Sequence, residues 1–240
     1  MRITLINPNT SRAMTAKIAA AAREVAGPEV DIVAVCPDEG PAAIESHVDE
    51  AFAAAAVIEL IQRDQRAGGS DGYVIACFGD PGLDAARELV EVPVVGIAEA
   101  AMHVASLAGR SFGVVTTLSR TLGRAQDLLA RYGMQQACVS LDAAGIPVLD
   151  LEETGAESLE KIESACLEAV RSRHADAIVL GCAGMANLCA TLTTRVGVPV
   201  VDGVAAAVGL VAAMSRMGVG TSKRDEYARP PRPLAMPTLC

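Results

Sequence analysis

The sequence predicts an α/β protein made of two related halves, each built on a parallel sheet. Two stretches share one pattern, because 71–77 and 176–182 each open with an aspartate, continue through apolar or small residues and end on a cysteine. Short apolar runs bounded by turn signals are typical of fully buried parallel strands. A glycine-containing turn, a helical segment and a short Pro-Val-Val strand follow both runs, and Cys77 and Cys182 lie 105 residues apart. We therefore expect an internal repeat in which the two thiols occupy matching positions.

The first half is expected to alternate strands with helices. Ser11 has the residue type of a helix N-cap, and Asp80, which precedes a proline, is predicted to cap the helix that follows Cys77. Strands are predicted at 2–6, 30–35, 71–77 and 93–95, and helices at 13–26, at 47–66 and after the turn at 79–82.

The second half repeats this alternation, which indicates parallel sheets. The acidic stretch 142–156 is expected to be a loop, and the tail 218–240 has no period. Strands are predicted at 111–116, 137–141, 176–182 and 199–201, and helices at 98–108, 120–131, 158–173 and 204–217. The prediction is thus two lobes of four parallel strands, related by a pseudo-twofold axis. Residues 1–98 plus 205–240 form the first lobe, which carries Cys77, and residues 99–204 form the second, which carries Cys182.

The composition indicates a soluble protein that acts on a small molecule. A net charge of −9 and 2% aromatic residues argue against a nucleic-acid partner, which needs basic side chains and stacking surfaces. We expect no membrane span and no secretory leader, since Asn7-Pro8 interrupts the first apolar run. Seven cysteines without the spacing of a disulfide framework fit a reducing cytoplasm.

The sequence contains no motif that would hold a metal or a cofactor. It has no C-x-x-C pair and its three histidines are scattered, so a zinc site is not expected. The dinucleotide-binding G-x-G-x-x-G pattern and the P-loop pattern do not occur. We therefore expect chemistry that needs neither a metal nor a cofactor.

Cys77 and Cys182 are the candidate catalytic residues. Each ends a predicted strand, at the edge where open α/β sheets form ligand sites. Each also precedes a predicted helix, whose N-terminus should lower the pKa of the thiol. The remaining cysteines are interpreted as small hydrophobes, the usual role of a free cysteine: Cys36, Cys138, Cys166, Cys189 and Cys240.

Two thiols on opposite sides of one cleft would suit the inversion of a stereocentre. If the lobes face their strand ends toward each other, one thiolate can remove a proton from a carbon while the opposing thiol delivers a proton to the other face. Asn9, Thr116 and Thr117 also lie at predicted strand ends. They could hydrogen-bond a substrate or serve only as turn and cap residues, and the sequence favours neither interpretation.

Four segments resemble the aspartate/glutamate/hydantoin racemase superfamily, and most closely its hydantoin and allantoin racemases: Ile6–Ser11, Ile75–Leu83, Gly96–Ala101 and Val179–Met185. The resemblance extends from Arg2 to about Ser222. It implies a cofactor-independent racemase, a homo-oligomer, and two Rossmann-like lobes with the active site between them. By position it assigns Cys77 and Cys182 as the acid–base pair and a substrate site lined by Asn9, Ile44, Phe78, Gly79, Thr116, Thr117, Ala183 and Gly184.

The superfamily leaves several reactions open. The expected one is inversion at C5 of a 5-substituted hydantoin or of allantoin. The alternatives are an aspartate/glutamate-type amino acid racemase, a decarboxylase or maleate isomerase of the superfamily, and a two-lobed binding protein without catalysis. Arylmalonate decarboxylase retains one of the two thiols, whereas this chain has both, which favours racemisation.

The loops assigned to the pocket contain no Lys or Arg, although Arg12 and Arg120 lie just beyond two of them. An amino dicarboxylate would need cationic partners for its two carboxylates. We therefore expect the substrate to be a neutral cyclic ureide.

Overall fold

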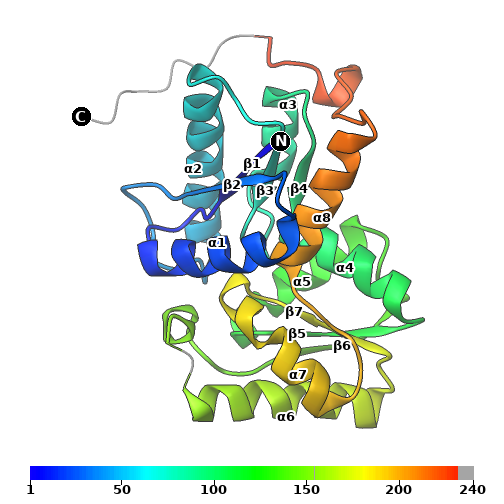
Figure 1. Cartoon of the computed structure of the whole chain (residues 1–240). Coiled ribbons are helices and arrows are strands. Elements are labelled where there is room, and N and C mark those ends of the chain that lie inside the picture. The colour runs from blue at the N-terminus through cyan, green and yellow to red at the C-terminus, as the bar shows by residue number, and fades with distance from the viewer. Residues whose placement is uncertain (154, 232–240) are drawn as a thin grey trace.

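The computed structural model describes residues 1–153 and 155–231, which form two four-stranded parallel sheets with helices around them (Figure 1). The strand order is β2-β1-β3-β4 in the first sheet and β6-β5-β7-β8 in the second. Both sheets therefore have the same order when their strands are numbered from the first of each half. The predicted α/β class with two four-stranded parallel sheets is confirmed.

The first sheet is flanked by helices that begin where the sequence places caps. The Ser11 hydroxyl accepts a hydrogen bond from the Met14 amide at 3.0 Å, and the Ser46 hydroxyl accepts one from the Asp49 amide. The strands are β1 (Arg2–Ile6), β2 (Asp31–Val35), β3 (Gly72–Ile75) and β4 (Val94–Gly96), and the helices are α1 (Arg12–Ala26), α2 (His47–Arg66) and α3 (Leu83–Leu89). All residues of β3 and β4 are buried, as their unbroken apolar sequence predicts.

The second sheet has the same pattern with shorter, less regular helices at its carboxyl edge. Its strands are β5 (Phe112–Thr116), β6 (Cys138–Ala143), β7 (Ala177–Leu180) and β8 (Val200–Val201). Its α-helices are α5 (Leu122–Arg131), α6 (Ala156–Arg173) and α7 (Cys189–Val196). Four 3₁₀ segments complete the described chain: η1 (Ser119–Thr121), η2 (Val148–Leu151), η3 (Ala183–Leu188) and η4 (Asp225–Tyr227).

Two of these 3₁₀ segments differ from the expectation. The stretch expected to be a loop after β6 contains η2, because Val148 and Leu151 lie three residues apart and the tight turn buries both. The chain after Cys182 enters η3 before it becomes the helix α7, so Cys182 precedes a 3₁₀ segment and not an α-helix.

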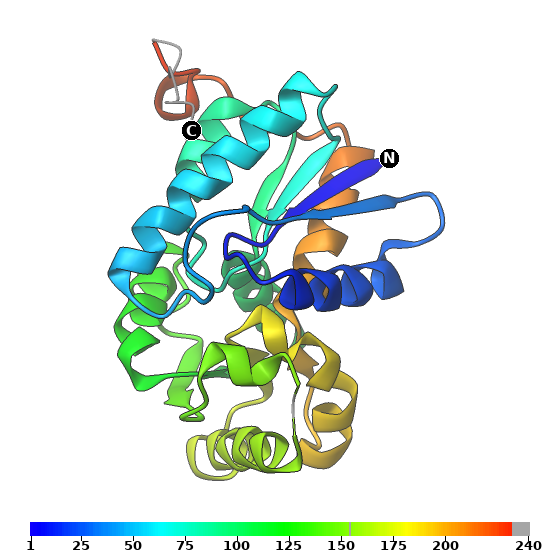
Figure 2. The same cartoon turned by 90° about the vertical axis from the view of Figure 1, so that its left-hand side faces the viewer.

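The two lobes share one apolar core. Helices α4 (Ile97–Ala108) and α8 (Gly203–Arg216) pack against each other, and α1 runs along the boundary between the lobes (Figures 1 and 2). Buried side chains form a continuous cluster from the first sheet through α1, α4 and α8 to the second sheet. A second, smaller cluster lies between the opposite face of the first sheet and the helices α2 and α3. Because α8 packs on α1 and β3, we propose that the chain returns to the first lobe near residue 205.

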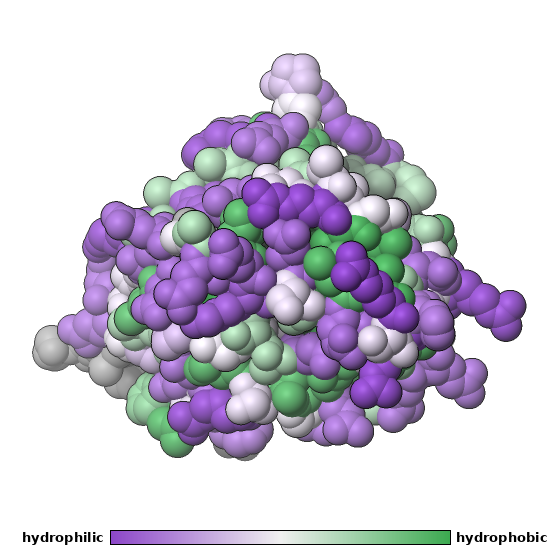
Figure 3. Space-filling view, turned by 90° about the horizontal axis from the view of Figure 1, so that it is seen from below, coloured by the Kyte–Doolittle hydropathy of each residue, from purple (hydrophilic) through white to green (hydrophobic). Residues whose placement is uncertain are grey.

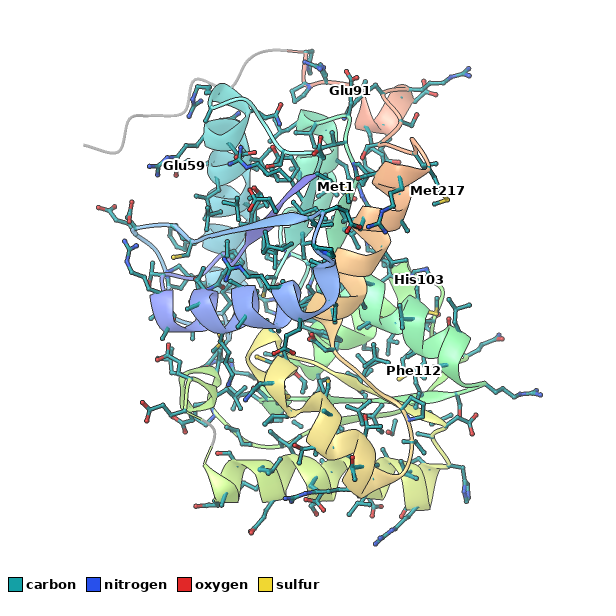
Figure 4. All side chains as sticks on the ribbon, in the orientation of Figure 1. Met1, Glu59, Glu91, His103, Phe112 and Met217 are labelled. Carbon is teal, nitrogen blue, oxygen red and sulfur yellow. The ribbon has the colours of Figure 1, made fainter. Side chains whose placement is uncertain are left out.

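The outer face of the second lobe carries α6, a helix with buried Ile162, Cys166 and Ala169 on one side. Seen from that side, hydrophilic and apolar residues are interspersed over the surface (Figure 3). Side chains such as Glu59 on α2 point away from the molecule, whereas Phe112 lies inside the second lobe (Figure 4). In the part of the chain that is described, none of the helices is long and apolar enough to cross a membrane.

The prediction that Asp80 caps α3 is wrong. Gly82, in a left-handed conformation, occupies the N-cap of α3, and the Asp80 carboxylate accepts hydrogen bonds from the Ala98 and Glu99 amides at 3.1 and 2.9 Å. It therefore caps α4, a helix that begins after Gly96. Glycine offers no capping side chain, and a Cβ at Gly96 would collide with the Asp80 carboxyl group.

The matching helix of the second half, α8, is capped in the ordinary way. The Asp202 carboxylate accepts hydrogen bonds from the Val204 and Ala205 amides at 3.0 and 2.9 Å. Both amides belong to the first turn of the helix, where they have no partner within it.

Replacing Asp202 by Ala is expected to lower the free energy of unfolding by about 1 kcal/mol, because two amides at the start of α8 lose their acceptor. Urea denaturation of the two proteins measures the difference. Asp38→Ala is a suitable control, because Asp38 is exposed and its carboxylate pairs with the exposed Arg12 side chain. Equal stability of Asp202→Ala and the unaltered protein would contradict the assignment.

Candidate active site

A cavity of about 210 Å³ lies where the carboxyl ends of the two sheets meet. It receives residues from the loops after β1, β2 and β3 of the first lobe and from the ends of β5 and β7 of the second. Pockets for drug-sized ligands measure roughly 300–1,000 Å³. This cavity therefore suits a smaller molecule.

All ten residues that the sequence singled out line this cavity. They come from five separate segments: Asn9 after β1; Ile44 after β2; Cys77, Phe78 and Gly79 after β3; Thr116 and Thr117 at the end of β5; and Cys182, Ala183 and Gly184 after β7. The carboxyl ends of parallel strands meet at one edge of a sheet, and the two edges face each other across the cavity.

The two cysteines have equivalent local surroundings. Cys77 follows the last residue of β3 by two positions, and Cys182 follows the last residue of β7 by two positions. Each sulfur accepts a hydrogen bond from the amide two residues further on, Gly79 for Cys77 and Gly184 for Cys182. Gly181 permits the close approach of β5, because a Cβ there would lie 2.7 Å from the Cβ of Thr116.

The expected lowering of both thiol pKa values is wrong. Burial raises the pKa of Cys77 to about 12 and that of Cys182 to about 11. The amide hydrogen bonds lower both values, but by less than the loss of water raises them. Desolvation outweighs local dipoles here because the thiolate exchanges many water contacts for one amide.

Charged neighbours make the two thiols unequal. Beyond burial, the second thiol, Asp80 and Glu50 all raise the pKa of Cys77. The positive charge of Lys17 lowers the pKa of Cys182, and Glu45 raises it. Lys17 also donates a hydrogen bond to the Leu151 carbonyl at 2.6 Å, so its ammonium group is held between α1 and the second lobe.

Asn9 makes turn contacts and also lines the cavity. Its Oδ1 accepts hydrogen bonds from the Asn7 side chain at 2.8 Å and from the Ser11 amide at 2.9 Å, which is turn chemistry. Among the described residues its Nδ2 has no hydrogen-bond partner, so this amide can donate to a ligand in the cavity. The Thr116 hydroxyl donates to the Gly181 carbonyl at 3.1 Å and thereby fixes the ends of β5 and β7 together.

The expectation of a cavity wall without cationic side chains is wrong. Arg120 and Arg124, from η1 and α5, line the cavity together with Glu45, His47 and Glu50 from the start of α2. Arg12, by contrast, is mostly exposed and pairs with Asp38 at 2.7 Å. Of these residues the sequence pointed only to Arg120, which lies just beyond a predicted pocket loop. The others come from segments that only the packing of the two lobes brings to the cavity.

Most of these charged groups are compensated. The Arg124 Nε lies 2.9 Å from Glu50 Oε1, and its Nη2 donates to the Gly79 carbonyl at 2.6 Å. Glu45 Oε1 accepts a hydrogen bond from the Val148 amide at 2.8 Å. Within the described residues Arg120 has no ion-pair partner within 4.0 Å. The pKa of Asp49 is lowered mainly by its hydrogen bond with Ser46, and the positive charge of Arg120 lowers it further.

The other described cysteines do not line the cavity. Cys166 is fully buried in the core, as predicted, whereas Cys36, Cys138 and Cys189 are partly exposed. Cys240 lies outside the described residues. No group of three or more His, Cys, Asp or Glu side chains that could hold a metal ion occurs among residues 1–153 and 155–231.

Comparison with known proteins places this geometry in a family. Residues 3–211 match the family model of the Asp/Glu/Hydantoin racemases. The chain is 44% identical to a hydantoin racemase of Pseudomonas sp. (strain NS671) and 41% identical to one of Paenarthrobacter aurescens. Each alignment covers 96% of this chain, with 92% and 98% of the respective relative. An allantoin racemase structure from Klebsiella pneumoniae superposes with a TM-score of 0.95 at 50% identity, over 99% of this chain and 97% of the other. The chain belongs to the Asp/Glu/hydantoin racemase family.

Proposed function

We propose that this protein racemises the C5 stereocentre of a hydantoin-type cyclic ureide, a 5-substituted hydantoin or allantoin, with Cys77 and Cys182 as the two bases. The observation that carries the proposal is that both thiols line one cavity at matching positions of two facing sheets. The names of the relatives, hydantoin racemase and allantoin racemase, support the same class of substrate.

The reaction needs one thiolate and one thiol on opposite faces of the ring. The thiolate removes the C5 proton and becomes a thiol, while the electron pair left on carbon spreads onto the adjacent ring carbonyl. The opposing thiol then gives its proton to the other face of C5 and becomes the thiolate. Protons balance, the configuration at C5 is inverted, and the two cysteines have exchanged roles for the reverse reaction.

Hydrogen-bond donors in the cavity suit the developing negative charge. The Asn9 Nδ2 amide can donate to a ring carbonyl, and the Arg120 guanidinium adds a positive charge at the wall. Donors that the fold holds in place stabilise an enolate-like intermediate more than mobile water molecules would.

The formal charges along the cavity wall favour a neutral substrate. Arg124 is compensated by Glu50, and the positive charge of Arg120 is opposed by Glu45, which lines the same cavity. An amino dicarboxylate would bring two negative charges into this balance. A ureide is neutral, and its alternating N–H and C=O groups can hydrogen-bond to both the anionic and the cationic side chains. We therefore propose a ureide over aspartate or glutamate.

The proposed mechanism and the family resemblance also suggest a cellular compartment and an oligomeric state. Both thiols must stay reduced, so we propose the cytoplasm as its compartment. We further propose that it is a homo-oligomer, as its family resemblance implies.

Replacement of either Cys77 or Cys182 by Ser is expected to lower kcat/KM for racemisation by about 10³-fold, because a hydroxyl is a far poorer base and acid at neutral pH. Polarimetry follows racemisation, and NMR in D₂O follows exchange of the C5 proton. Each variant can still exchange the proton of one enantiomer. Cys36→Ser is the control, because Cys36 does not line the cavity. Near-normal racemisation by Cys182→Ser would rule out the two-base mechanism.

The activity is expected to rise with pH, because the raised thiol pKa values leave little thiolate at neutrality. Thiolate increases about tenfold per pH unit as long as the pH is well below the pKa. We therefore expect kcat/KM to increase about tenfold per unit between pH 6 and 8, after subtraction of the uncatalysed rate. A plateau that begins below pH 7.5 would mean that the free enzyme already holds a thiolate of ordinary or low pKa.

Among possible substrates, a 5-alkylhydantoin and allantoin are expected to be racemised with a kcat/KM far above that of aspartate or glutamate. The reason is the balance of charges along the wall. Parallel assays with the four compounds provide the comparison. Faster turnover of either amino acid would show that Arg120 and Arg124 bind carboxylates and that the charge argument is wrong.

A further inference from the structure

The internal repeat is broken at one pair of positions beside the thiols. The third residue after Cys77 is Asp80, whereas the third residue after Cys182 is the buried Met185. The residue after the Pro-Val-Val strand is Gly96 in the first half and Asp202 in the second, and each is the N-cap of the helix that follows. In the second half the capping carboxylate thus belongs to the residue just before the helix, Asp202. In the first half it belongs to the turn after the cysteine, at Asp80.

Asp80 is held by several hydrogen bonds at once. Its side chain is buried, with the residue only 2% exposed, and its backbone amide donates to the Cys77 carbonyl at 3.0 Å. Its carboxylate accepts from two amides of α4 and from the Tyr132 hydroxyl, the latter at 2.7 Å. It adopts a φ of 45°, which costs energy for a non-glycine residue. The turn that carries Cys77 is therefore tied to α4 and to the second lobe through one carboxylate.

Hydrogen bonds to the buried Asp80 carboxylate limit the rise of its pKa, so that it is ionised at neutral pH. Burial raises the pKa of Asp80 to about 6, and the Tyr132 hydroxyl and the two α4 amides oppose that rise. Glu99 on α4 adds a negative charge, but Arg87 pairs with it at 2.6 Å. Tyr132 itself contacts the ring of His103 and the guanidinium of Arg131.

The charged groups that face the two thiols differ in sign. Asp80 and Glu50 face Cys77, with Glu50 paired to Arg124. Lys17 and Glu45 face Cys182. His47 lies 3.6 Å from Glu50 at the mouth of the cavity, where its side chain is 86% exposed and screened by water.

We propose that Asp80 is a positioning residue that acts through Cys77. It fixes the turn that carries this thiol, and its fixed negative charge, at the position that Met185 takes after Cys182, makes Cys77 the thiol that keeps its proton. Cys182 is then the first of the pair to ionise. The proposal rests on the racemase function proposed above. It makes the two directions of the reaction unequal, because one enantiomer presents its C5 proton to Cys182, which ionises more readily, and the other presents it to Cys77.

The test measures each thiol separately and needs no turnover. Methyl methanethiosulfonate, a neutral reagent that reacts with thiolates, is added to the whole protein, and mass spectrometry of unreduced peptides gives the rate at each cysteine. Asp80→Asn is compared with the unaltered protein and with Asp202→Asn. The second variant is the matched control, because it alters the equivalent cap in the half whose cysteine turn carries no aspartate.

We expect Asp80→Asn to accelerate modification of Cys77 at pH 8 by about tenfold, the equivalent of one pKa unit, and to leave Cys182 unchanged. Asp202→Asn should leave the modification rates of both Cys77 and Cys182 unchanged. It should accelerate modification of Cys189, whose pKa is raised mainly by burial and further by the charge of Asp202. Equal acceleration of both cavity thiols by Asp80→Asn, or the same effect on Cys77 in Asp202→Asn, overturns the proposal.

A measurement on the unaltered protein keeps the proposal testable if Asp80→Asn does not fold. Below pH 6 the Asp80 carboxyl is protonated and its effect on Cys77 is lost. The ratio of the Cys182 rate to the Cys77 rate should therefore increase as the pH rises from 5 to 8, whatever the relative access to the two thiols. A constant ratio overturns the proposal. Because these rates are independent of racemisation, a protein that fails the hydantoin assay but shows this pattern refutes the proposed function alone.

Discussion

The geometry of the cavity depends on the apolar core that the two lobes share. Buried side chains of α1, α4 and α8 join the first sheet to the second, so the carboxyl ends of the sheets are held at a fixed separation. Polar contacts complete the joint at the rim, such as Arg124 with the Gly79 carbonyl and Glu45 with the Val148 amide. An independent core for each lobe would leave their relative position to a few such partly buried hydrogen bonds, each of which contributes only about 1 kcal/mol.

That burial also determines the state of the thiols. Loss of water around the sulfurs raises the pKa of both Cys77 and Cys182, so little thiolate is present at neutral pH. The thiolate that does form is a stronger base than one in water, and proton removal from carbon needs a strong base. The amides of Gly79 and Gly184 limit the rise in pKa, because each donates a hydrogen bond to the sulfur. The repeat therefore provides both the surroundings that desolvate each thiol and the amide donors that limit the rise of its pKa.

The two halves of the repeat nevertheless differ in the residues next to the two thiols. A reaction that runs equally in both directions needs two like groups, and the chain supplies two cysteines at matching points. Their neighbours need not match, since a single proton must reside on one of them. The exchange of a capping aspartate between the helix start and the cysteine turn, Asp202 in one half and Asp80 in the other, creates such a difference without any change in the fold.

Much of the fold follows from the sequence because it depends on local patterns. Apolar runs gave the strands to within a few residues, Ser11 marked the start of α1, and the repeated Pro-Val-Val strands predicted that both halves would have the same topology. The ten candidate residues line one cavity because strand ends of parallel sheets meet at one edge, a rule that needs no coordinates.

Only the tertiary structure decided the electrostatics of the site. The cap formed by Asp80 on α4, the approach of Arg120 and Arg124, and the net rise of both thiol pKa values depend on contacts between segments far apart in the chain. A sequence reveals that a residue can cap or ionise, but the partner and the loss of water are properties of packing. Asp80 was therefore assigned to the nearest helix in the sequence, whereas in the folded chain the amides of α4, made accessible by Gly96, are the ones within its reach.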